Sequence, residues 1–245
     1  MDWLTAEIGE LLSRGFVLTI WITGITSIFS LLLGIGVGTL KLIQRPITRQ
    51  LAIIYIEIHR NVPALVLIIF WAFAFPNIFP LEIRRTIFFD NAIISKISLW
   101  TGLSIPYYTL AAGFALTLNT SAYLAELFRA GVGTIEQEHL DSARTLGAPK
   151  KTLLWQIIIP QGIRAAFPAI STRLIHNMKN TALASFVAMP EFFHGIQTAI
   201  TYSFHAVELL LLASAVYLGL SFTFSFLLRW IENRLNQGSL VIQNG

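Results

Sequence analysis

Long apolar runs, separated by short charged segments, dominate the sequence. Four runs contain no Asp, Glu, Lys or Arg: residues 15–40, 61–81, 97–125 and 209–228. A fifth stretch, residues 165–190, is mostly apolar but contains Arg173, His176 and Lys179. A helix of about 20 apolar residues is long enough to cross the hydrocarbon layer of a membrane. The pattern therefore predicts an all-α integral membrane protein with five transmembrane helices, over residues 15–41, 50–76, 98–126, 165–190 and 208–229.

The basic residues predict how the chain is oriented in the membrane. With the amino terminus outside, eleven of the 17 Lys and Arg residues lie in segments that face the cytoplasm and four in segments that face outward. This asymmetry follows the positive-inside rule and places the carboxyl terminus inside. Residues 1–14 then form an outer-surface segment, as a short helix on the membrane or as a frayed terminus. Residues 234–245 form a cytoplasmic tail.

Composition supports the membrane assignment and excludes several other classes of protein. Charged residues make up 12% of the 245 residues, about half the ~25% of a soluble domain. The formal charge of +4 is explained by the segments between apolar runs, so we expect no nucleic-acid partner. The absence of cysteine excludes disulfides, thiolate metal sites and a catalytic thiol.

Motifs for nucleotide binding and catalysis are missing from the sequence. It contains no GxxxxGK[ST] loop and no HExxH sequence. Gly34, Gly36 and Gly38 lie inside a continuous apolar run with no strand before them, so their spacing predicts close helix packing and not a nucleotide site. We therefore expect a chain that is not an enzyme and that holds no metal or cofactor.

The longest polar segment, residues 126–164, is expected to face the cytoplasm. Residues 135–146 predict one short helix, with Gly147 in the left-handed position that ends it. Pro149 is expected in the first turn of a second, amphipathic helix, which should stop at Pro160. Such a segment is either a connector or a docking site for a cytoplasmic partner.

This segment resembles the EAA loop of ABC importer permeases, Glu-Ala-Ala-x3-Gly-x9-Ile-x-Leu-Pro. Asp141-Ser142-Ala143 is followed after three residues by Gly147, and after nine more by Ile157-Ile158-Ile159-Pro160. Residues 55–63, 121–131 and 179–183 are similar to the polar amino-acid permeases of the histidine, glutamine and glutamate type. The resemblance extends over nearly the whole chain, and its motifs occur in the right order.

The resemblance implies the transmembrane-domain fold of a type I ABC importer, over residues 15–233, in a bacterial plasma (inner) membrane. The implied partners are ABC ATPase subunits that bind ATP and Mg, a second permease subunit that is a copy or a relative of this chain, and an extracytoplasmic amino-acid-binding protein. ATPase closure would move the spans as rigid bodies through the loop at 126–164. The resemblance implies that the following residues couple the permease to the ATPase: Glu138, Asp141, Ser142, Ala143, Gly147, Pro149, Ile157 and Pro160.

Charged residues inside the predicted spans suggest a path for the substrate. Arg173, His176, Asn177 and Asn180 share one helix face, with Lys179 at its edge. We expect this face to lie toward the subunit interface, because charges are costly in lipid. The candidate path residues are Arg60, Asn61, Arg173, His176, Asn177, Lys179, Asn180, Thr181 and Ser185.

Two interpretations of these charges stay open. Glu57 is positioned to pair with Arg60 at i, i+3, and such pairs can serve only to hold helices together. Alternatively, the basic residues bind the carboxylate of an amino acid in transit. Their excess over acidic residues favours glutamate, aspartate or glutamine as the substrate.

Two other classes of protein compete with the importer. A subunit of a secondary amino-acid transporter would also show five spans and intramembrane charge, but it would not explain the spacing of the EAA loop. An intramembrane enzyme would need convergent acid–base groups or metal ligands, which the scattered histidines and acids do not provide.

Overall fold

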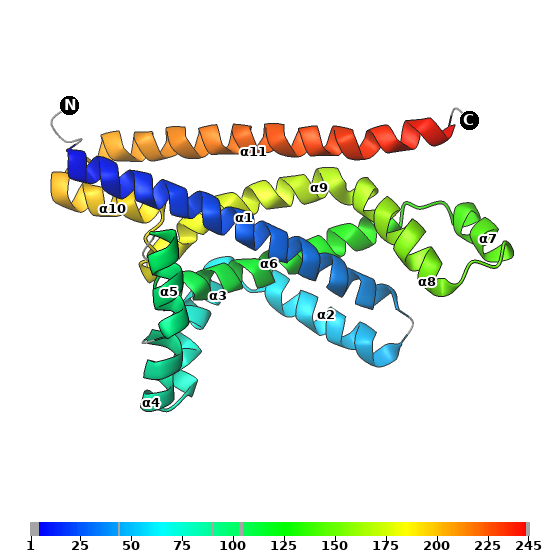
Figure 1. The fold of residues 1–245 in the computed structure, drawn as a ribbon, viewed down its shortest axis with the longest axis horizontal. Helices are drawn as coiled ribbons and strands as arrows, with labels where there is room; N and C mark the ends of the chain where they lie inside the picture. Colours follow the sequence, from blue (N-terminus) through cyan, green and yellow to red (C-terminus); the bar gives the residue numbers. More distant parts are fainter. Residues whose placement is uncertain (1–4, 44, 90, 103–104, 244–245) are drawn as a thin grey trace. The chain divides into compact units, whose positions relative to one another are not determined.

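The computed structural model describes residues 5–43, 45–89, 91–102 and 105–243, and this part of the chain is helical with no strand. Figure 1 labels the main helices along the chain. In order, the elements are α1 (Ala6–Leu42), α2 (Pro46–Asn61), α3 (Ala64–Ile69), η1 (Phe70–Ala74), η2 (Pro76–Ile78), α4 (Leu81–Arg84), η3 (Arg85–Phe89), α5 (Ala92–Thr101), α6 (Tyr107–Val132), α7 (Gln137–Thr145), α8 (Lys150–Thr152), η4 (Leu153–Ile158), α9 (Ile159–Asn180), η5 (Thr181–Val187), α10 (Phe192–Ser203) and α11 (Ala206–Gln243).

The chain divides into two compact units. Unit 1 comprises residues 1–28, 62–119 and 176–221, and unit 2 comprises residues 29–61, 120–175 and 222–245. Helices α1, α6, α9 and α11 contribute residues to both units.

Unit 1 contains two clusters of buried apolar side chains. One cluster brings together α1, α3, α6 and η5, with Leu18, Ile68 and Leu116 among its members. The other joins the start of α1 to α10 and α11 through residues such as Ile8 and Ile196, and Figure 1 shows α10 beside the amino-terminal end of α1. The predicted outer-surface segment thus continues directly into the first long helix from Ala6, apart from residues 1–4, which lie outside the described part of the chain.

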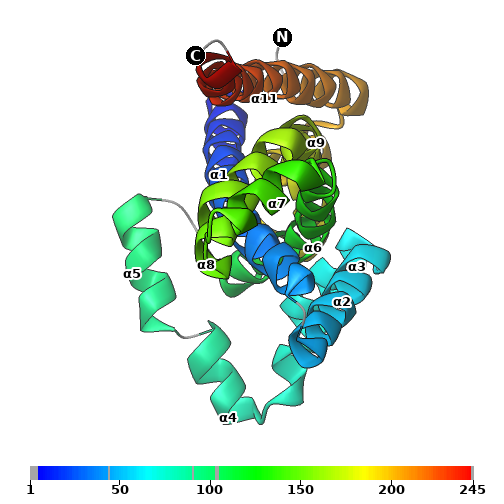
Figure 2. The ribbon, with the colours of Figure 1, turned by 90° about the vertical axis from the view of Figure 1, so that its right-hand side faces the viewer.

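In unit 2, α2 lies against the later part of α1 and against α6 (Figures 1 and 2). A Cβ atom placed on Gly34 would lie 2.7 Å from the Cβ of Leu124, and one on Gly38 would lie 2.8 Å from Cδ1 of Phe128. Gly36, which lies between them, has open space around it. The predicted packing role of this glycine sequence is therefore confirmed, and it depends on Gly34 and Gly38.

Three helices in the described part of the chain are long and apolar enough to cross a membrane: Ala6–Leu42, Lys150–Val187 and Ala206–Leu235. A fourth results if the pair Pro46–Asn61 and Ala64–Ile78 forms one broken span. Helix α6 is 26 residues long but is not among them, because polar residues such as Asn119 and Ser121 interrupt it. These side chains are buried. Five spans and the orientation of the termini therefore stay predictions.

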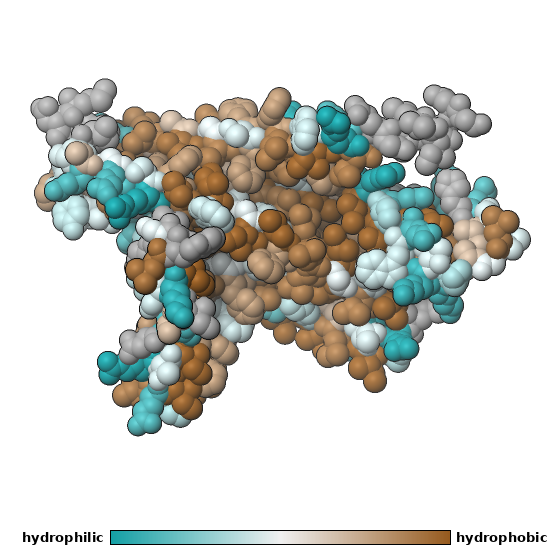
Figure 3. All heavy atoms as spheres, in the orientation of Figure 1, coloured by the Kyte–Doolittle hydropathy of each residue, from teal (hydrophilic) through white to brown (hydrophobic). Residues whose placement is uncertain are grey.

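The exposed surface of the long helices is apolar, as contact with lipid requires. Leu32 is 65% exposed on α1, and Leu211, Phe222 and Phe226 are 65%, 65% and 74% exposed on α11. Figure 3 shows brown, hydrophobic atoms over much of both helices on the face that it displays.

One predicted helix begins later than expected. The apolar run that predicted a helix over 98–126 is divided, because α5 ends at Thr101 and α6 begins only at Tyr107. Pro106 comes directly before the start of α6. A proline disfavours the helical backbone conformation in the residue that precedes it, so α6 does not extend back past Pro106. The charge-free run therefore contains the end of one helix and most of another.

Candidate functional site

The end of α7 is capped by the backbone of residues 143–148. Gly147 has φ +79°, its N–H donates to the carbonyl of Arg144 at 2.9 Å, and the N–H of Ala148 donates to the carbonyl of Ala143 at 3.0 Å. These two bonds and the left-handed glycine form a Schellman motif. The predicted positive φ of Gly147 is confirmed, and the spacing from Ala143 to Gly147 is the spacing that this motif requires.

Helix α7 presents its polar side chains to the outside. The carboxylate of Asp141 accepts hydrogen bonds from Arg144 at 2.7 Å and from Gln137 at 3.3 Å, and all of these groups are exposed. Glu138 and Ser142 are also exposed, whereas Ala143 is half-buried. Two large apolar side chains nearby, Leu146 and Trp155, are 88% and 62% exposed.

The two prolines of this segment do not lie as predicted. Pro149 is the residue before α8, with ψ 152°, and not part of its first turn. The helix does not end at Pro160, because α8, η4 and α9 follow one another from Lys150 to Asn180. The turns before Pro160, Leu153–Ile158, are π-helical. A wider turn relieves the clash between a proline ring and the preceding carbonyl groups, so the helix continues with Ile157 and Pro160 half-buried.

In unit 2, Tyr123 on α6 brings two of the predicted path residues together. Its hydroxyl donates to the backbone carbonyl of Arg60 at 3.0 Å, and the guanidinium carbon of Arg173 lies 3.8 Å from the centre of its ring. Two residues before Tyr123 on α6, the hydroxyl of Ser121 lies 2.6 Å from the hydroxyl of Tyr55 on α2. Sequence reasoning assigned no role to Tyr123, since a tyrosine in an apolar run carries no signal of its own.

The predicted partner of Arg60 is wrong. Glu57 accepts a hydrogen bond from the side chain of Asn61 at 2.7 Å, and no ion pair joins it to Arg60 among the described residues. The i, i+4 bond to Asn61 forms inside the last turn of α2, where both side chains are exposed.

Unit 1 contains the remaining path residues, and they differ in exposure. Asn177 is completely buried, and its amide donates to Thr26 at 2.8 Å and to Ser27 at 3.4 Å. It therefore joins α9 to α1 inside this chain, and the orientation of the remaining residues of this face toward a subunit interface stays a prediction. Thr181 and Ser185 are also buried, Asn180 is half-buried, and His176 and Lys179 are exposed.

Lys179 lines a cavity of about 340 Å³ in unit 1. The cavity lies among α9, η5, α10 and α11. Lys179 forms no ion pair with an acidic residue in the described part of the chain. The residues that line it are Lys179, Ala182, Phe193, Leu210, Ala213, Ser214 and Tyr217.

A buried carboxylate that the sequence analysis missed holds three helices of unit 1 together. Glu191 is 0% exposed and caps α10 by accepting from the N–H groups of Phe193 at 2.9 Å and His194 at 2.7 Å. It also accepts from the hydroxyls of Tyr217 on α11 at 3.0 Å and Thr19 on α1 at 3.3 Å. Burial raises the pKa of the Glu191 carboxyl, although these hydrogen bonds act in the opposite direction.

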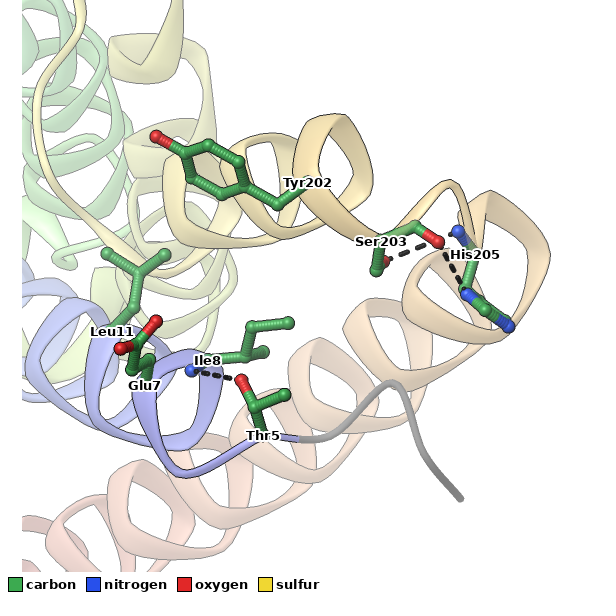
Figure 4. Close-up of a pocket in the computed structure, with 7 residues that line it drawn as sticks. All are labelled: Thr5, Glu7, Ile8, Leu11, Tyr202, Ser203 and His205. Atoms are coloured by element: carbon green, nitrogen blue, oxygen red, sulfur yellow. Dashed lines mark hydrogen bonds between the residues drawn. The ribbon is translucent and has the colours of Figure 1, made fainter.

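Figure 4 shows a second pocket of unit 1, where the start of α1 meets the segment between α10 and α11. Its volume is about 510 Å³. His205 is held there by Ser203, whose carbonyl lies 2.7 Å from Nδ1 of the imidazole. The residues that line the pocket are Thr5, Glu7, Ile8, Leu11, Tyr202, Ser203 and His205.

Comparison with known proteins identifies the family. Residues 12–237 match the family described as "Binding-protein-dependent transport system inner membrane component". The chain belongs to this family. It is thus an inner-membrane permease subunit of an ABC importer, in which a separate ATPase hydrolyses ATP, and the resemblance found in the sequence is confirmed.

Curated relatives of the permease cover nearly its full length. A probable glutamine ABC transporter permease protein, GlnP of Bacillus subtilis, is 31% identical over 240 residues, which are 96% of this chain and 99% of the relative. The L-cystine transport system permease protein TcyL of the same organism is 27% identical, and the alignment covers 89% of this chain and 84% of TcyL. The glutamine transport system permease protein GlnP of Escherichia coli is 26% identical, and the alignment covers 92% of this chain and 93% of that protein.

Solved structures show the same fold. A chain from the crystal structure of an amino acid ABC transporter with histidines superposes with a TM-score of 0.73 at 24% identity, covering 93% of the permease and 95% of that chain. A chain from the inward-facing MetNI methionine ABC transporter gives a TM-score of 0.68 at 18% identity, and the superposition covers 95% of the permease and 99% of that chain. The permease therefore has the transmembrane fold of these importers.

In the part of the permease that the structure describes, no group of three or more His, Cys, Asp or Glu side chains that could bind a metal ion occurs.

Proposed function

We propose that this permease carries an amino acid with a second carboxylate or an amide, namely glutamate, aspartate or glutamine, across the membrane. The proposal includes five spans with the amino terminus outside and the carboxyl terminus inside. Lys179 carries the proposal, because it lies at an apolar cavity of about 340 Å³ without an ion pair to a described acidic residue. The other residues that line the cavity are mostly apolar, so the exposed ammonium group of Lys179 is the cation that a carboxylate entering the cavity would meet. Relatives named for glutamine support the substrate class.

Arg60 and Arg173 form the second part of the proposed path. Tyr123 orders both residues, by its hydrogen bond to the Arg60 carbonyl and by its ring beneath the Arg173 guanidinium. A guanidinium above an aromatic ring keeps its N–H groups at its edge, where they can form paired bonds to a carboxylate. In this proposal Asn177, Thr181 and Ser185 shape the helix that holds Lys179, since all three are buried.

Substitutions that remove a single charge test the path. Lys179→Met and Arg60→Met should leave assembly and basal ATP hydrolysis unchanged, while uptake of glutamine or glutamate falls about 10- to 100-fold, the value of a charge-assisted hydrogen bond. Lys96→Met, on exposed α5, is the matched control and should transport normally. Uptake at the wild-type rate in both variants would remove these residues from the path.

Helix α7 is proposed to bind the ATPase. Its Schellman cap fixes the angle between α7 and the chain that leads into α8, and its exposed residues include Glu138, Asp141 and Ser142. Leu146 and Trp155 provide an apolar centre for the contact. A rigid contact at this helix can transmit ATPase closure to α9, because η4 and α9 follow α8 without interruption.

The extracytoplasmic binding protein is proposed to dock in unit 1, at the start of α1. The pocket in Figure 4 lies near the start of α1, which the proposed orientation places outside. Tyr202 and Phe204 beside it are 76% and 89% exposed, and aromatic side chains are enriched where proteins bind each other. A second permease subunit, either a copy or a relative of this chain, completes the proposed importer. Mass measurement of the purified complex distinguishes the two.

A further inference from the structure

A basic cleft lies in unit 2, where the end of α1, the start of α2 and the end of α6 meet. Its volume is about 420 Å³, within the range of about 300–1,000 Å³ that small-ligand sites occupy. Nothing in the coupling loop or the proposed substrate path accounts for it. The residues that line it are Lys41, Leu42, Ile43, Arg49, Arg129, Val132 and Gly133.

The cleft carries more positive charge than its one acidic neighbour neutralises. Glu126 forms ion pairs with Lys41 and with Nε of Arg129, the latter at 2.9 Å. The Glu126 side chain is only 16% exposed, so it fixes both cations in place. Arg49 forms no ion pair with any acidic residue in the described part of the chain. Three cations and one carboxylate leave two positive charges for a ligand.

The geometry of the arginines suits a phosphate group. The Arg129 guanidinium uses Nε for Glu126, which leaves the N–H groups of its two Nη atoms for another acceptor. Arg49 is exposed at the first turns of α2. Arginine binds phosphate oxygens through paired N–H groups, so these two side chains can hold one phosphate from both sides.

A stripe of exposed apolar side chains runs along the other face of α2, about 180° around the helix from Arg49. Ile47, Leu51, Ile54 and Ile58 are 75%, 63%, 46% and 50% exposed, and their spacing puts them on one helix face. From Ile47 to Ile58 the stripe is about 16 Å long at 1.5 Å per residue, about half of the ~30 Å hydrocarbon layer of a membrane. Figure 3 shows brown atoms predominating on the visible face of α2.

We propose that this cleft binds the phosphate of an anionic phospholipid from the cytoplasmic leaflet, with Arg49 and Arg129 on the headgroup. The proposal rests on the orientation with the amino terminus outside, and it is independent of which amino acid is carried. Basic pockets between membrane helices on the cytoplasmic side are suited to anionic headgroups.

Two other occupants would share part of this chemistry. A free phosphate would use the same two arginines, and the test distinguishes it from a lipid headgroup. An acidic surface of the ATPase could also contact the cations. However, within unit 2 the coupling helix α7 is separate from the α1–α2 turn in both Figure 1 and Figure 2. This separation, together with the exposed apolar stripe on the other face of α2, which indicates contact of this helix with lipid, favours the phospholipid.

The test uses the assembled importer in nanodiscs that contain phosphatidylethanolamine with or without phosphatidylglycerol. Native mass spectrometry counts the phosphatidylglycerol molecules that remain bound after extraction. Wild-type importer should retain phosphatidylglycerol selectively. Arg49→Gln and Arg129→Gln should each weaken that selectivity about fivefold, and the double variant about thirtyfold. Arg45→Gln removes a charge from the same turn but from outside the cleft, so its selectivity should equal that of the wild type.

Each contrary outcome overturns the assignment to a lipid. Unchanged phosphatidylglycerol retention in the double variant would overturn it, as would an equal loss in Arg45→Gln, which would indicate general surface attraction. Binding of inorganic phosphate that depends on both arginines, without selection for phosphatidylglycerol, would assign the cleft to a soluble phosphate. Loss of the ATPase from the purified complex with normal lipid retention would assign it to the ATPase.

Discussion

At the scale of single residues, Glu191 joins three helices through four hydrogen bonds of one buried carboxylate. Its buried carboxylate accepts two backbone N–H groups of α10 and two hydroxyls, from Thr19 and Tyr217. Gly15 allows the backbone at Glu191 to come this close to α1, since a Cβ atom on Gly15 would lie 2.8 Å from the Glu191 carbonyl oxygen. A polar group that links elements so far apart in the chain is expected to determine how they pack.

Replacing Glu191 should therefore destabilise unit 1. Glu191→Ala removes a helix cap, worth about 0.5–2 kcal/mol, and leaves buried donors unsatisfied at about 1–3 kcal/mol each. Glu191→Gln keeps an acceptor of the same shape and should cost less. Thermal unfolding of the purified importer in detergent measures both. Equal stability of Glu191→Ala and the wild type would contradict the linking role.

Comparison of the wild type with Glu191→Gln also predicts how the stability of the folded protein depends on pH. Because the folded-state pKa of Glu191 is raised above the ordinary 4.5, the folded protein holds this proton more tightly than the unfolded chain does. The stability of the wild type relative to Glu191→Gln should rise as the pH falls from the raised pKa toward 4.5. Unfolding curves at a series of pH values test this sign, and an opposite slope would mean that the hydrogen bonds outweigh burial.

Gly147 gives a prediction that separates backbone conformation from side-chain contact. No atom lies within 4 Å of a Cβ placed there, so any effect of substitution comes from its φ of +79°. Gly147→Val should cost about 1–2 kcal/mol at the cap and should reduce ATPase co-purification and coupled transport while the subunit still inserts. Gly147→Asn, which tolerates this conformation, is the control. Normal transport by the valine variant would exclude the coupling role of the cap.

At the scale of elements, the glycines of α1 determine how closely α1 and α6 approach. Gly34→Ala and Gly38→Ala each place a Cβ under 3 Å from α6, and overpacking of this kind costs about 1–3 kcal/mol. Gly36→Ala, with open space around it, should cost nothing and can stabilise the helix. Thermal unfolding of the three variants side by side is the measurement. A loss as large in Gly36→Ala as in the other two variants would show that the cost does not come from contact between α1 and α6.

The helix from Lys150 onward shows where local rules were insufficient. A proline after an amphipathic segment predicted a helix end at Pro160, but the π-helical turns of Leu153–Ile158 carry the helix past it. Which backbone carbonyl accepts which N–H depends on packing around the helix, and sequence spacing does not report it. In contrast, the end of α7 could be predicted, because a Schellman cap needs only glycine at the right position.

At the scale of the whole molecule, orientation and the number of spans are the main predictions. Cysteine introduced at Lys151 should resist a membrane-impermeant thiol reagent applied from outside, and cysteine at Thr201 should react. Both positions are exposed, and the chain has no native cysteine to react instead. Labelling of permeabilised cells confirms that each thiol is reactive. Reaction at Lys151 in intact cells, with protection at Thr201, would reverse the proposed orientation.

The sequence by itself determined the properties that depend on residue type and spacing. These are the helical membrane class, the family, the cap at Gly147 and the packing glycines of α1, because each follows from local composition or from a fixed number of residues along one helix. Only the tertiary structure decided which polar groups meet. Tyr123 beside Arg60 and Arg173, Asn177 against Thr26, and Glu191 between α1 and α11 all join segments far apart in the chain. The partner of a buried polar group is set by how helices pack, and packing depends on the shapes of many side chains together.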